Sequence, residues 1–237
     1  MGTLQAKSIK VAIAANVAYA MDELKKEFHS LYPDIQIDII IGGTGKLYAQ
    51  IQHHAPYDIL MAANMLYPEN LYKSGDAITR PIVYAQGSLA LLSPKGLKLD
   101  PDLKSLTLPS IHKIALANPK TAPYGVATVE ALKHAKLYDQ LRNKFVYGES
   151  ISQTVTYATR VTDMGFIAKS ALYSPKLSQF KQGVHWVEVN PKLYTPIDQG
   201  IVLLKHAQQR PEASAFFTFV LGQRAKTIFE KFGYRIP

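Results

Sequence analysis

The segment IIGGTGKLYAQI, residues 40–51, has the residue types of a phosphate-binding loop: a hydrophobic run, a glycine-rich turn and then a lysine. A Walker-type loop requires a glycine, four further residues and then Gly-Lys-Ser/Thr. Ile40 stands where the first glycine belongs, and Leu47 stands where a hydroxyl would bind magnesium. The segment is therefore not a nucleotide-binding loop. Lys46 is then expected at the start of a helix and facing solvent.

The same segment is still suited to another anion, because the first amides of a helix lack intrahelical acceptors and lie at the positive end of its dipole. Thr44 adds a hydroxyl donor. One such turn by itself is more often an ordinary connection between a strand and a helix. Three further strand-to-helix turns are expected, at residues 14–16, 122–125 and 148–152.

These further turns also carry donor groups. Asn16 and Ser150 occupy expected N-cap positions, and Tyr124 carries a phenol. In parallel α/β sheets such turns lie at the carboxyl edge of the strands, where ligands bind. Each turn alone predicts only a helix cap. The four together predict a site for one small anion, with two turns from each of two lobes.

Residues that could support catalysis or bind a metal lack the partners such chemistry requires. Ser88 lies outside a G-x-S-x-G motif, and the adjacent His53 and His54 lack the i, i+4 spacing of a zinc-binding helix. Asp163 has no evident partner, whereas Asp58 is expected to bond local backbone donors or to reach the ligand cleft. We therefore expect no enzyme, no cofactor and no site for a bare metal cation.

Two β/α series must position the anion-binding turns. The first has strands at 9–16, 35–41 and 57–63 with helices between and after them, which implies a parallel sheet with helices on its faces. A second series begins at 113. Extended double segments, at 82–93 and at 193–205 with a break near Gly200, would connect the two series. The expected lobes are 1–84 with 199–237, and 85–198, with a ligand cleft between them.

Composition narrows the function further. The chain has 237 residues, no cysteine and a net charge of +9, from 27 Lys plus Arg against 18 Asp plus Glu. The basic residues are scattered rather than clustered, so no nucleic-acid partner is expected. No apolar run approaches the roughly 18 residues of a membrane span. The lack of cysteine excludes disulfides and thiolate metal sites.

The N-terminal sequence MGTLQAKSIKVAIAAN has no basic region followed by an apolar one, as a signal peptide would have. Either the protein is cytosolic or its signal peptide is absent from this chain, and Met-Gly directly before a strand-like segment fits the second alternative. The segment also lacks the Ser or Thr of a myristoylation signal.

Seven segments of the chain resemble the periplasmic molybdate-binding proteins of ABC importers. They are VAIAAN, GGTGKLYAQI, APYDILMAA, ANPKTAPYG, GESISQT, MGFIA and AKTIFEKFGY, within about residues 9–235. The resemblance implies the α/β type II periplasmic binding protein fold, two lobes joined by a two-strand hinge. It also implies a monomeric periplasmic receptor that captures molybdate or tungstate and delivers it to a membrane permease. Whether its N-terminus is free or lipid-anchored stays open.

The family's oxyanion contacts, carried over by motif, fall on Ala15, Asn16, Thr44, Tyr124 and Ile151. Asn16 and Thr44 stand where serine is usual, and Tyr124 stands where alanine is usual. Ile151 would offer only its backbone N–H. At Ala168 many members carry a tyrosine that reaches the anion, and the resemblance implies that Tyr124 supplies this phenol from a different loop.

The chemistry of the donors agrees with this ligand. Molybdate is a tetrahedral dianion that only accepts hydrogen bonds, and amide, hydroxyl and phenol groups can donate them. Phosphate keeps a proton near neutral pH and would need an acceptor, whereas sulfate must be rejected by size. A receptor for sulfate, phosphate or a small organic anion, or a ligand-sensing domain of this fold, remains an alternative.

Overall fold

The computed structural model describes residues 7–237, and these form two compact units. The first comprises residues 7–85, 198–231 and 236–237, and the second comprises 86–197 and 232–235. The sequence predicts all of 199–237 in the first lobe, whereas residues 232–235 belong to the second unit. The expectations for a signal peptide and for myristoylation concern residues 1–6 and lie outside the described part of the chain.

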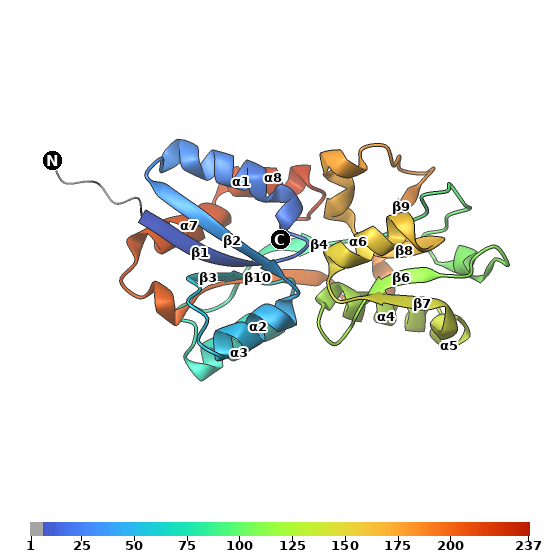
Figure 1. Ribbon diagram of the computed structural model, residues 1–237, viewed down its shortest axis with the longest axis horizontal. Coiled ribbons are helices and arrows are strands. Elements are labelled where there is room, and N and C mark those ends of the chain that lie inside the picture. Colours follow the sequence, from blue (N-terminus) through green and yellow to red (C-terminus); the bar gives the residue numbers. More distant parts are fainter. Residues whose placement is uncertain (1–6) are drawn as a thin grey trace. The chain divides into compact units, whose positions relative to one another are not determined.

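The first unit contains a five-stranded sheet with the order β2-β1-β3-β10-β4. Its strands are β1 (Lys7–Ala14), β2 (Ile35–Gly42), β3 (Ile59–Met61), β10 (Ile197–Leu203) and β4 (Ile82–Gly87). Its helices are α1 (Ala18–Leu31), α2 (Thr44–Gln52), α3 (Leu66–Ser74), α7 (Pro211–Leu221) and α8 (Gln223–Lys231). Helices α1, α7 and α8 cover one face of the sheet, and α2 and α3 cover the other (Figure 1).

The second unit also contains a five-stranded sheet, with the order β7-β6-β8-β5-β9. Its strands are β5 (Leu89–Leu92), β6 (Ile114–Ala117), β7 (Phe145–Gly148), β8 (Met164–Ala168) and β9 (Trp186–Glu188). Its α-helices are α4 (Pro123–His134), α5 (Tyr138–Leu141) and α6 (Ile151–Arg160). Helix α6 packs on one face of this sheet and α4 on the other (Figure 1).

The sequence predicts parallel sheets, but each of the two sheets is mixed and only some of its strands are parallel. Strands β1, β2 and β3 are parallel, but β10 pairs with β3 in the antiparallel direction. In the second unit, β6 is parallel to β7 and β8, whereas β5 is antiparallel to β8. The strands that follow helices are parallel, because a βαβ crossover returns the chain in the same direction.

The predicted break at Gly200 is wrong, because β10 runs through this residue without interruption. A Cβ at Gly200 would lie 2.7 Å from the sulfur of Met65 and 3.0 Å from Pro68. The glycine therefore allows α3 and the preceding turn to pack closely on β10. The break in the other double segment lies at Ser88, between β4 and β5.

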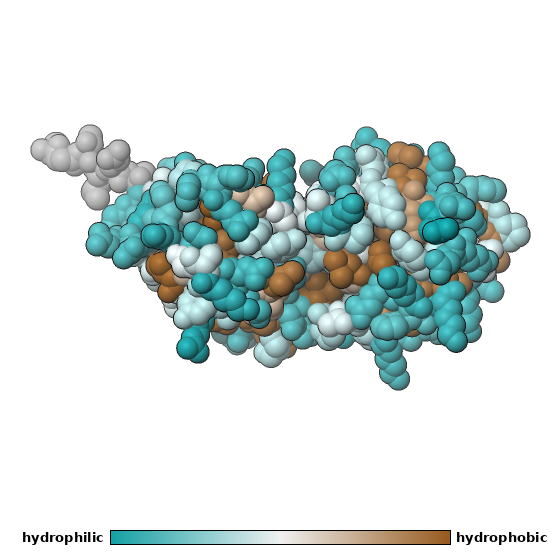
Figure 2. All heavy atoms as spheres, turned by 90° about the horizontal axis from the view of Figure 1, so that it is seen from below, coloured by the Kyte–Doolittle hydropathy of each residue, from teal (hydrophilic) through white to brown (hydrophobic). Residues whose placement is uncertain are grey.

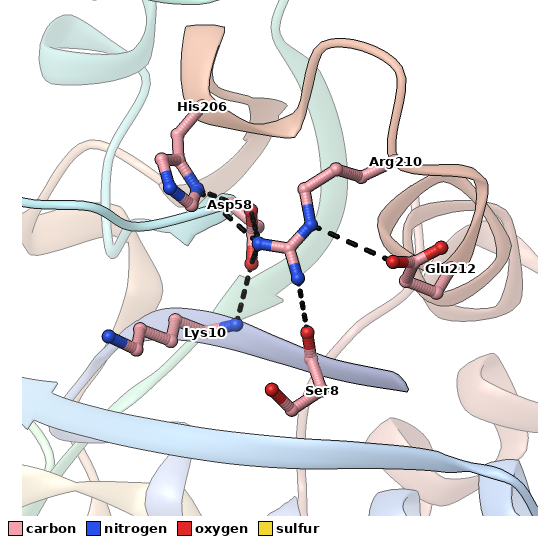
Figure 3. A network of polar contacts seen from close by, with 6 residues as sticks. All are labelled: Ser8, Lys10, Asp58, His206, Arg210 and Glu212. Atoms are coloured by element: carbon pink, nitrogen blue, oxygen red, sulfur yellow. Dashed lines mark hydrogen bonds and ion pairs between the residues drawn. The ribbon is translucent and has the colours of Figure 1, made fainter. Parts of the chain in front are cut away.

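A network of polar contacts ties the amino end of β3 to the C-terminal part of the first unit (Figure 3). Asp58 is fully buried and accepts hydrogen bonds from the Lys10 amide at 2.7 Å and from Arg210 Nη1 at 2.8 Å. His206 Nδ1 lies 2.7 Å from the same carboxylate, and Arg210 also bonds the Ser8 carbonyl. Asp58 therefore bonds a backbone donor as expected, but that donor, the Lys10 amide, is 48 residues away and not local.

The apolar residues of the first unit form a core on both sides of its sheet. Leu47 and Ile51 of α2 pack with Ala12 and Leu60 of the sheet on one side. On the other side, the rings of Phe28 and Phe216 meet edge to face. Leu47, which takes the place of a magnesium-binding hydroxyl, is therefore a core residue.

Hydrophilic residues predominate on the face shown in Figure 2, and the hydrophobic residues form smaller groups among them. No helix within residues 7–237 is long and apolar enough to cross a membrane.

Candidate anion-binding site

The turn after β1 is held by hydrogen bonds to two other strands. The Ala15 amide donates to the Gly42 carbonyl at 3.0 Å, which ties the turn to the end of β2. Asn16 Nδ2 donates to Gln199 Oε1 of β10 at 2.8 Å. The predicted N-cap role of Asn16 is wrong, because α1 begins at Ala18 and Val17 occupies the cap position. Its side chain is instead completely buried and bonded to Gln199 of β10.

Thr44 lies at the first position of α2, and its side chain is buried. Its hydroxyl oxygen accepts a hydrogen bond from the Ala63 amide at 3.1 Å, just after β3. A hydroxyl that accepts in this way keeps its own hydrogen for a further acceptor. Gly43, the N-cap residue, makes no side-chain cap, so the first amides of α2 are not closed off by a cap side chain. Lys46 is exposed in the first turn of α2, as predicted.

In the second unit, Tyr124 is the second residue of α4, directly after Pro123 at the first helical position. The tyrosine is almost completely buried. Gly125 allows the helix start to lie against the end of β6, since a Cβ there would be 2.3 Å from the Ala117 carbonyl oxygen. Any side chain at position 125 would push the start of α4, and Tyr124 with it, away from the sheet.

Ile151 is the first residue of α6, and its own side chain is buried. Ser150 caps this helix, because its hydroxyl oxygen accepts from the Gln153 amide at 3.2 Å. Gln153 Oε1 accepts in return from the Glu149 amide at 2.7 Å. The pair resembles a capping box, except that Gln153 accepts from the amide before the cap residue rather than from that of Ser150. The predicted cap at Ser150 is confirmed. Since the Ile151 side chain packs inward, only its backbone amide is suited to a ligand.

The two units place their predicted site residues at equivalent points. Strand orders β2-β1-β3 and β7-β6-β8 are the same arrangement, in which the ligand crevice forms outside the carboxyl ends of the strands. In the first unit, the amide of Ala15, which follows β1, donates to the carbonyl of Gly42, the last residue of β2. In the second unit, the amide of Asn118, which follows β6, donates at 2.8 Å to the carbonyl of Gly148, the last residue of β7.

Each sheet edge thus brings together one pair of predicted turns. Ala15, Asn16 and Thr44 follow the first and second strands of unit one, and Tyr124 and Ile151 follow the corresponding strands of unit two. Ala168 is the buried last residue of β8. This is the position at which the family resemblance implies a tyrosine in many members.

No local sequence pattern identifies Gln199 as part of the first edge. Gln199 accepts from both Asn16 and the Tyr84 hydroxyl, the second at 3.1 Å. The available signal is weak: Gln199 is an amide side chain two residues before the apolar run IVLL, and it follows Asp198 directly. Its partners are distant in the sequence, so no local pattern points to them.

The acidic groups considered for catalysis have structural roles. Asp163 accepts from the His112 and Lys113 amides at 2.9 and 3.0 Å. Burial opposes ionisation of this carboxyl, but these amides and Lys95 together hold its pKa below the usual value. His53 and His54 are exposed, and no cluster of three or more potential metal ligands occurs among residues 7–237.

The fold and these donor-rich turns define a solute-binding protein with the two-lobe type II periplasmic binding protein fold. The chain belongs to the family of bacterial extracellular solute-binding proteins, which it matches over residues 9–235, and within it to the ModA group of molybdate-binding proteins.

Two relatives show where in this family the chain lies. It is 34% identical to the molybdate-binding protein ModA of Azotobacter vinelandii over 234 residues, which cover 97% of this chain and 90% of the relative. Identity to ModA of Rhodobacter capsulatus is 31% over 227 residues, 94% of this chain and 87% of the relative.

The same relationship holds for the three-dimensional structure. The periplasmic molybdate-binding protein of Azotobacter vinelandii superimposes with a TM-score of 0.89 at 29% identity, covering 97% of this chain and 99% of that one. The resemblance predicted from the sequence motifs is thereby confirmed.

Proposed function

We propose that this protein is the molybdate receptor of an ABC importer. The observation that supports the proposal is that α2, α4 and α6 begin with residues that carry hydroxyl, phenol and backbone amide groups. A fully deprotonated oxyanion requires donors of this kind. The names of the relatives in Azotobacter and Rhodobacter support the same ligand. We further propose that tungstate, with nearly the same size and charge, binds at the same site.

In this proposal the two units are lobes that close on the ligand, and each contributes half of the site. Asn16 and Thr44 serve from the first lobe, and Tyr124 and the Ile151 amide serve from the second. The Ala15 amide already donates to the Gly42 carbonyl. We therefore propose that Ala15 positions the neighbouring Asn16 and does not itself donate to the ligand.

A dianion can be held in this way without a lysine or arginine, because several oriented amides share its charge. Glu149 is the only carboxylate within the four turns. It is exposed, and its Oε1 accepts from Asn118 Nδ2 at 3.4 Å. Burial of the ligand is tolerable only if its oxygens find donors, so sulfate would have to be rejected through the size of the closed site.

The proposal extends to the biological setting. The receptor would act in the periplasm as a monomer, either free or lipid-anchored, and would transfer its oxyanion to a membrane permease. It would bind without turning over its ligand, because the potential acid, base and metal ligands among the described residues have structural partners or are scattered.

Isothermal titration calorimetry with molybdate, tungstate, sulfate and phosphate tests the ligand assignment. Molybdate and tungstate are expected to bind tightly, and sulfate and phosphate weakly or not at all. Tight binding of phosphate without binding of molybdate would contradict the proposal and favour a receptor for another anion.

Replacement of Tyr124 by phenylalanine tests the half-site of the second unit. Loss of the phenol should weaken molybdate binding by about 1–3 kcal/mol, because a buried ligand oxygen loses its donor. The replacement of exposed Tyr147 by phenylalanine provides a matched control in the same unit. Unchanged affinity of the Tyr124 variant would show that the phenol does not contact the anion.

A further inference from the structure

We propose that Gln199 is a positioning residue for the anion site: it holds the Asn16 side chain and thereby fixes the turn after β1. The inference rests on the proposed function. Gln199 follows none of the strands that feed the predicted turns and belongs to no motif considered above. It is a residue of β10, which runs antiparallel to β3.

Strand direction explains why Gln199 reaches the site. Ile201 pairs with Met61 at the end of β3, and the Ala62 amide donates to the Gly200 carbonyl at 2.8 Å. Because β10 is antiparallel, its beginning lies at the carboxyl edge of β3. Gln199 is therefore at the same edge as Asn16 and beside the turn whose Ala63 amide bonds Thr44.

The contacts of Gln199 connect three buried polar side chains. Its Oε1 accepts from Asn16 Nδ2 at 2.8 Å and from the Tyr84 hydroxyl at 3.1 Å. Asn16 and Gln199 are 0% exposed, and Tyr84 is 1% exposed. Buried donors without an acceptor are strongly unfavourable, so an oxygen at this point stabilises both neighbours. The Tyr84 hydroxyl also donates to the Ala62 carbonyl at 3.4 Å.

Only two common side chains supply such an oxygen at this length, the amide of glutamine and the carboxylate of glutamate. A carboxylate would accept the same two bonds but would add a negative charge beside the proposed site of a dianion. A neutral amide satisfies Asn16 and Tyr84 without that repulsion. The chemistry of position 199 therefore matches an anion site as well as a buried network.

The position of the Asn16 side chain affects the whole turn, because the turn is short and hydrogen bonds hold the backbone on both sides of Asn16. The Ala15 amide donates to Gly42, and the Val17 amide donates to the Ala14 carbonyl at 2.9 Å. If the Asn16 side chain is released from Gln199, the turn loses this hydrogen bond to β10, and we expect these two amides to become more mobile.

The first experiment uses Gln199→Leu, which keeps the approximate size and removes the acceptor. Hydrogen exchange of the unliganded protein should show faster exchange at the Ala15 and Val17 amides, with no change at the Leu47 amide in α2. Calorimetry should show that molybdate binding weakens about tenfold or more, the expected effect of a broken buried hydrogen bond. Unchanged exchange at Ala15 and Val17, or affinity within about threefold of wild type, would overturn the proposal.

The second variant, Gln199→Glu, retains both hydrogen bonds and serves if the leucine variant does not fold. Molybdate binding to it should be weaker at about pH 8 and should strengthen by up to about tenfold per unit as the pH falls toward 6, because binding takes up one proton. The wild type should lack this dependence. A glutamate variant whose affinity has the pH profile of the wild type would contradict a position beside the anion.

Tyr84→Phe is the matched control, since it removes the other donor to Gln199 and leaves Asn16 bonded. Its molybdate affinity should stay within about threefold of wild type, and its turn amides should exchange normally. A loss as large as that of Gln199→Leu would assign the effect to the network in general and overturn a specific role for the Asn16 contact.

These measurements also separate the two proposals. Failure of the wild type to bind molybdate would contradict the proposed function, whereas the exchange of the unliganded turn would still decide the positioning role. Tight wild-type binding with an undiminished leucine variant would contradict only the role of Gln199.

Discussion

The two units build equivalent sheet edges by different means. In the first, side-chain hydrogen bonds across the sheet hold the turns: Asn16 bonds Gln199, and Thr44 bonds the Ala63 amide. In the second, close backbone packing and a helix cap hold them: Gly125 lies against Ala117, and Ser150 caps α6. The same strand order therefore does not require the same local interactions.

The difference indicates how each unit should respond to mutation. A network of side chains loses one contact at a time, and a conservative replacement can restore it. A glycine packed against a carbonyl accepts no side chain, so even the smallest replacement displaces the helix start. The two edges should therefore differ in their tolerance of substitutions, although their topology is shared.

The largest effect is expected away from the proposed site, at the opposite edge of the first sheet. Asp58→Ala should lower the free energy of unfolding by about 3–5 kcal/mol, because it leaves Arg210 and the Lys10 amide without their buried partner. The molybdate affinity of the folded variant should be close to wild type. Urea denaturation and calorimetry measure the two quantities, and a large loss of affinity would extend the ligand site to this network.

Gly125→Ala should have the next largest effect and tests the packed edge of the second unit. The added methyl group would overlap the Ala117 carbonyl, so the variant should be destabilised by about 1–3 kcal/mol and should also lose molybdate affinity as Tyr124 moves. Val126→Ala, at the exposed neighbour, should change stability by less than about 0.5 kcal/mol. Equal stability of the two variants would refute the close-packing explanation.

Thr44→Val tests the networked edge of the first unit with a replacement of almost the same shape. Molybdate affinity should fall by about 1–2 kcal/mol, since the variant loses its hydroxyl donor and leaves the Ala63 amide without its acceptor. Thr44→Ser should restore most of the affinity. Calorimetry on the three proteins decides the matter, and a serine variant as weak as the valine variant would point to packing rather than hydrogen bonding.

The smallest effect concerns pH and an ion pair of the second unit. Burial opposes ionisation of Glu188, but Lys169 at 2.6 Å and Arg235 at 2.8 Å hold its pKa below the usual value. Because the folded pKa is lowered, its contribution is present above the unfolded pKa, near 4, and is lost as the pH falls further.

The side chain of Glu188 is 22% exposed, so the contribution should be less than about 1 kcal/mol at neutral pH. The difference in unfolding free energy between wild type and Glu188→Gln should shrink as the pH falls from about 6 to 3. A difference independent of pH would contradict the role of this ion pair.

Much of the fold was predictable because the determinants are local. Apolar runs and glycine-rich turns identified the strands and helix starts, and Ser150 was correctly identified as a cap. Asn16 was misassigned because the same side chain can cap a helix or bond a residue of a neighbouring strand, and only its surroundings decide between them. The break expected at Gly200 failed because a glycine can also permit close packing within a continuous strand.

By itself, the sequence determined that the chain forms α/β units with amide-presenting turns, excluded a nucleotide loop at Ile40 and Leu47, and indicated the family. Only the tertiary structure decided what holds those turns. Asn16 and Gln199 are 183 positions apart, and Asp58 and Arg210 are 152 apart. Helix starts follow from the properties of neighbouring residues, whereas such pairs depend on which strands meet and in which direction, and no local pattern records that.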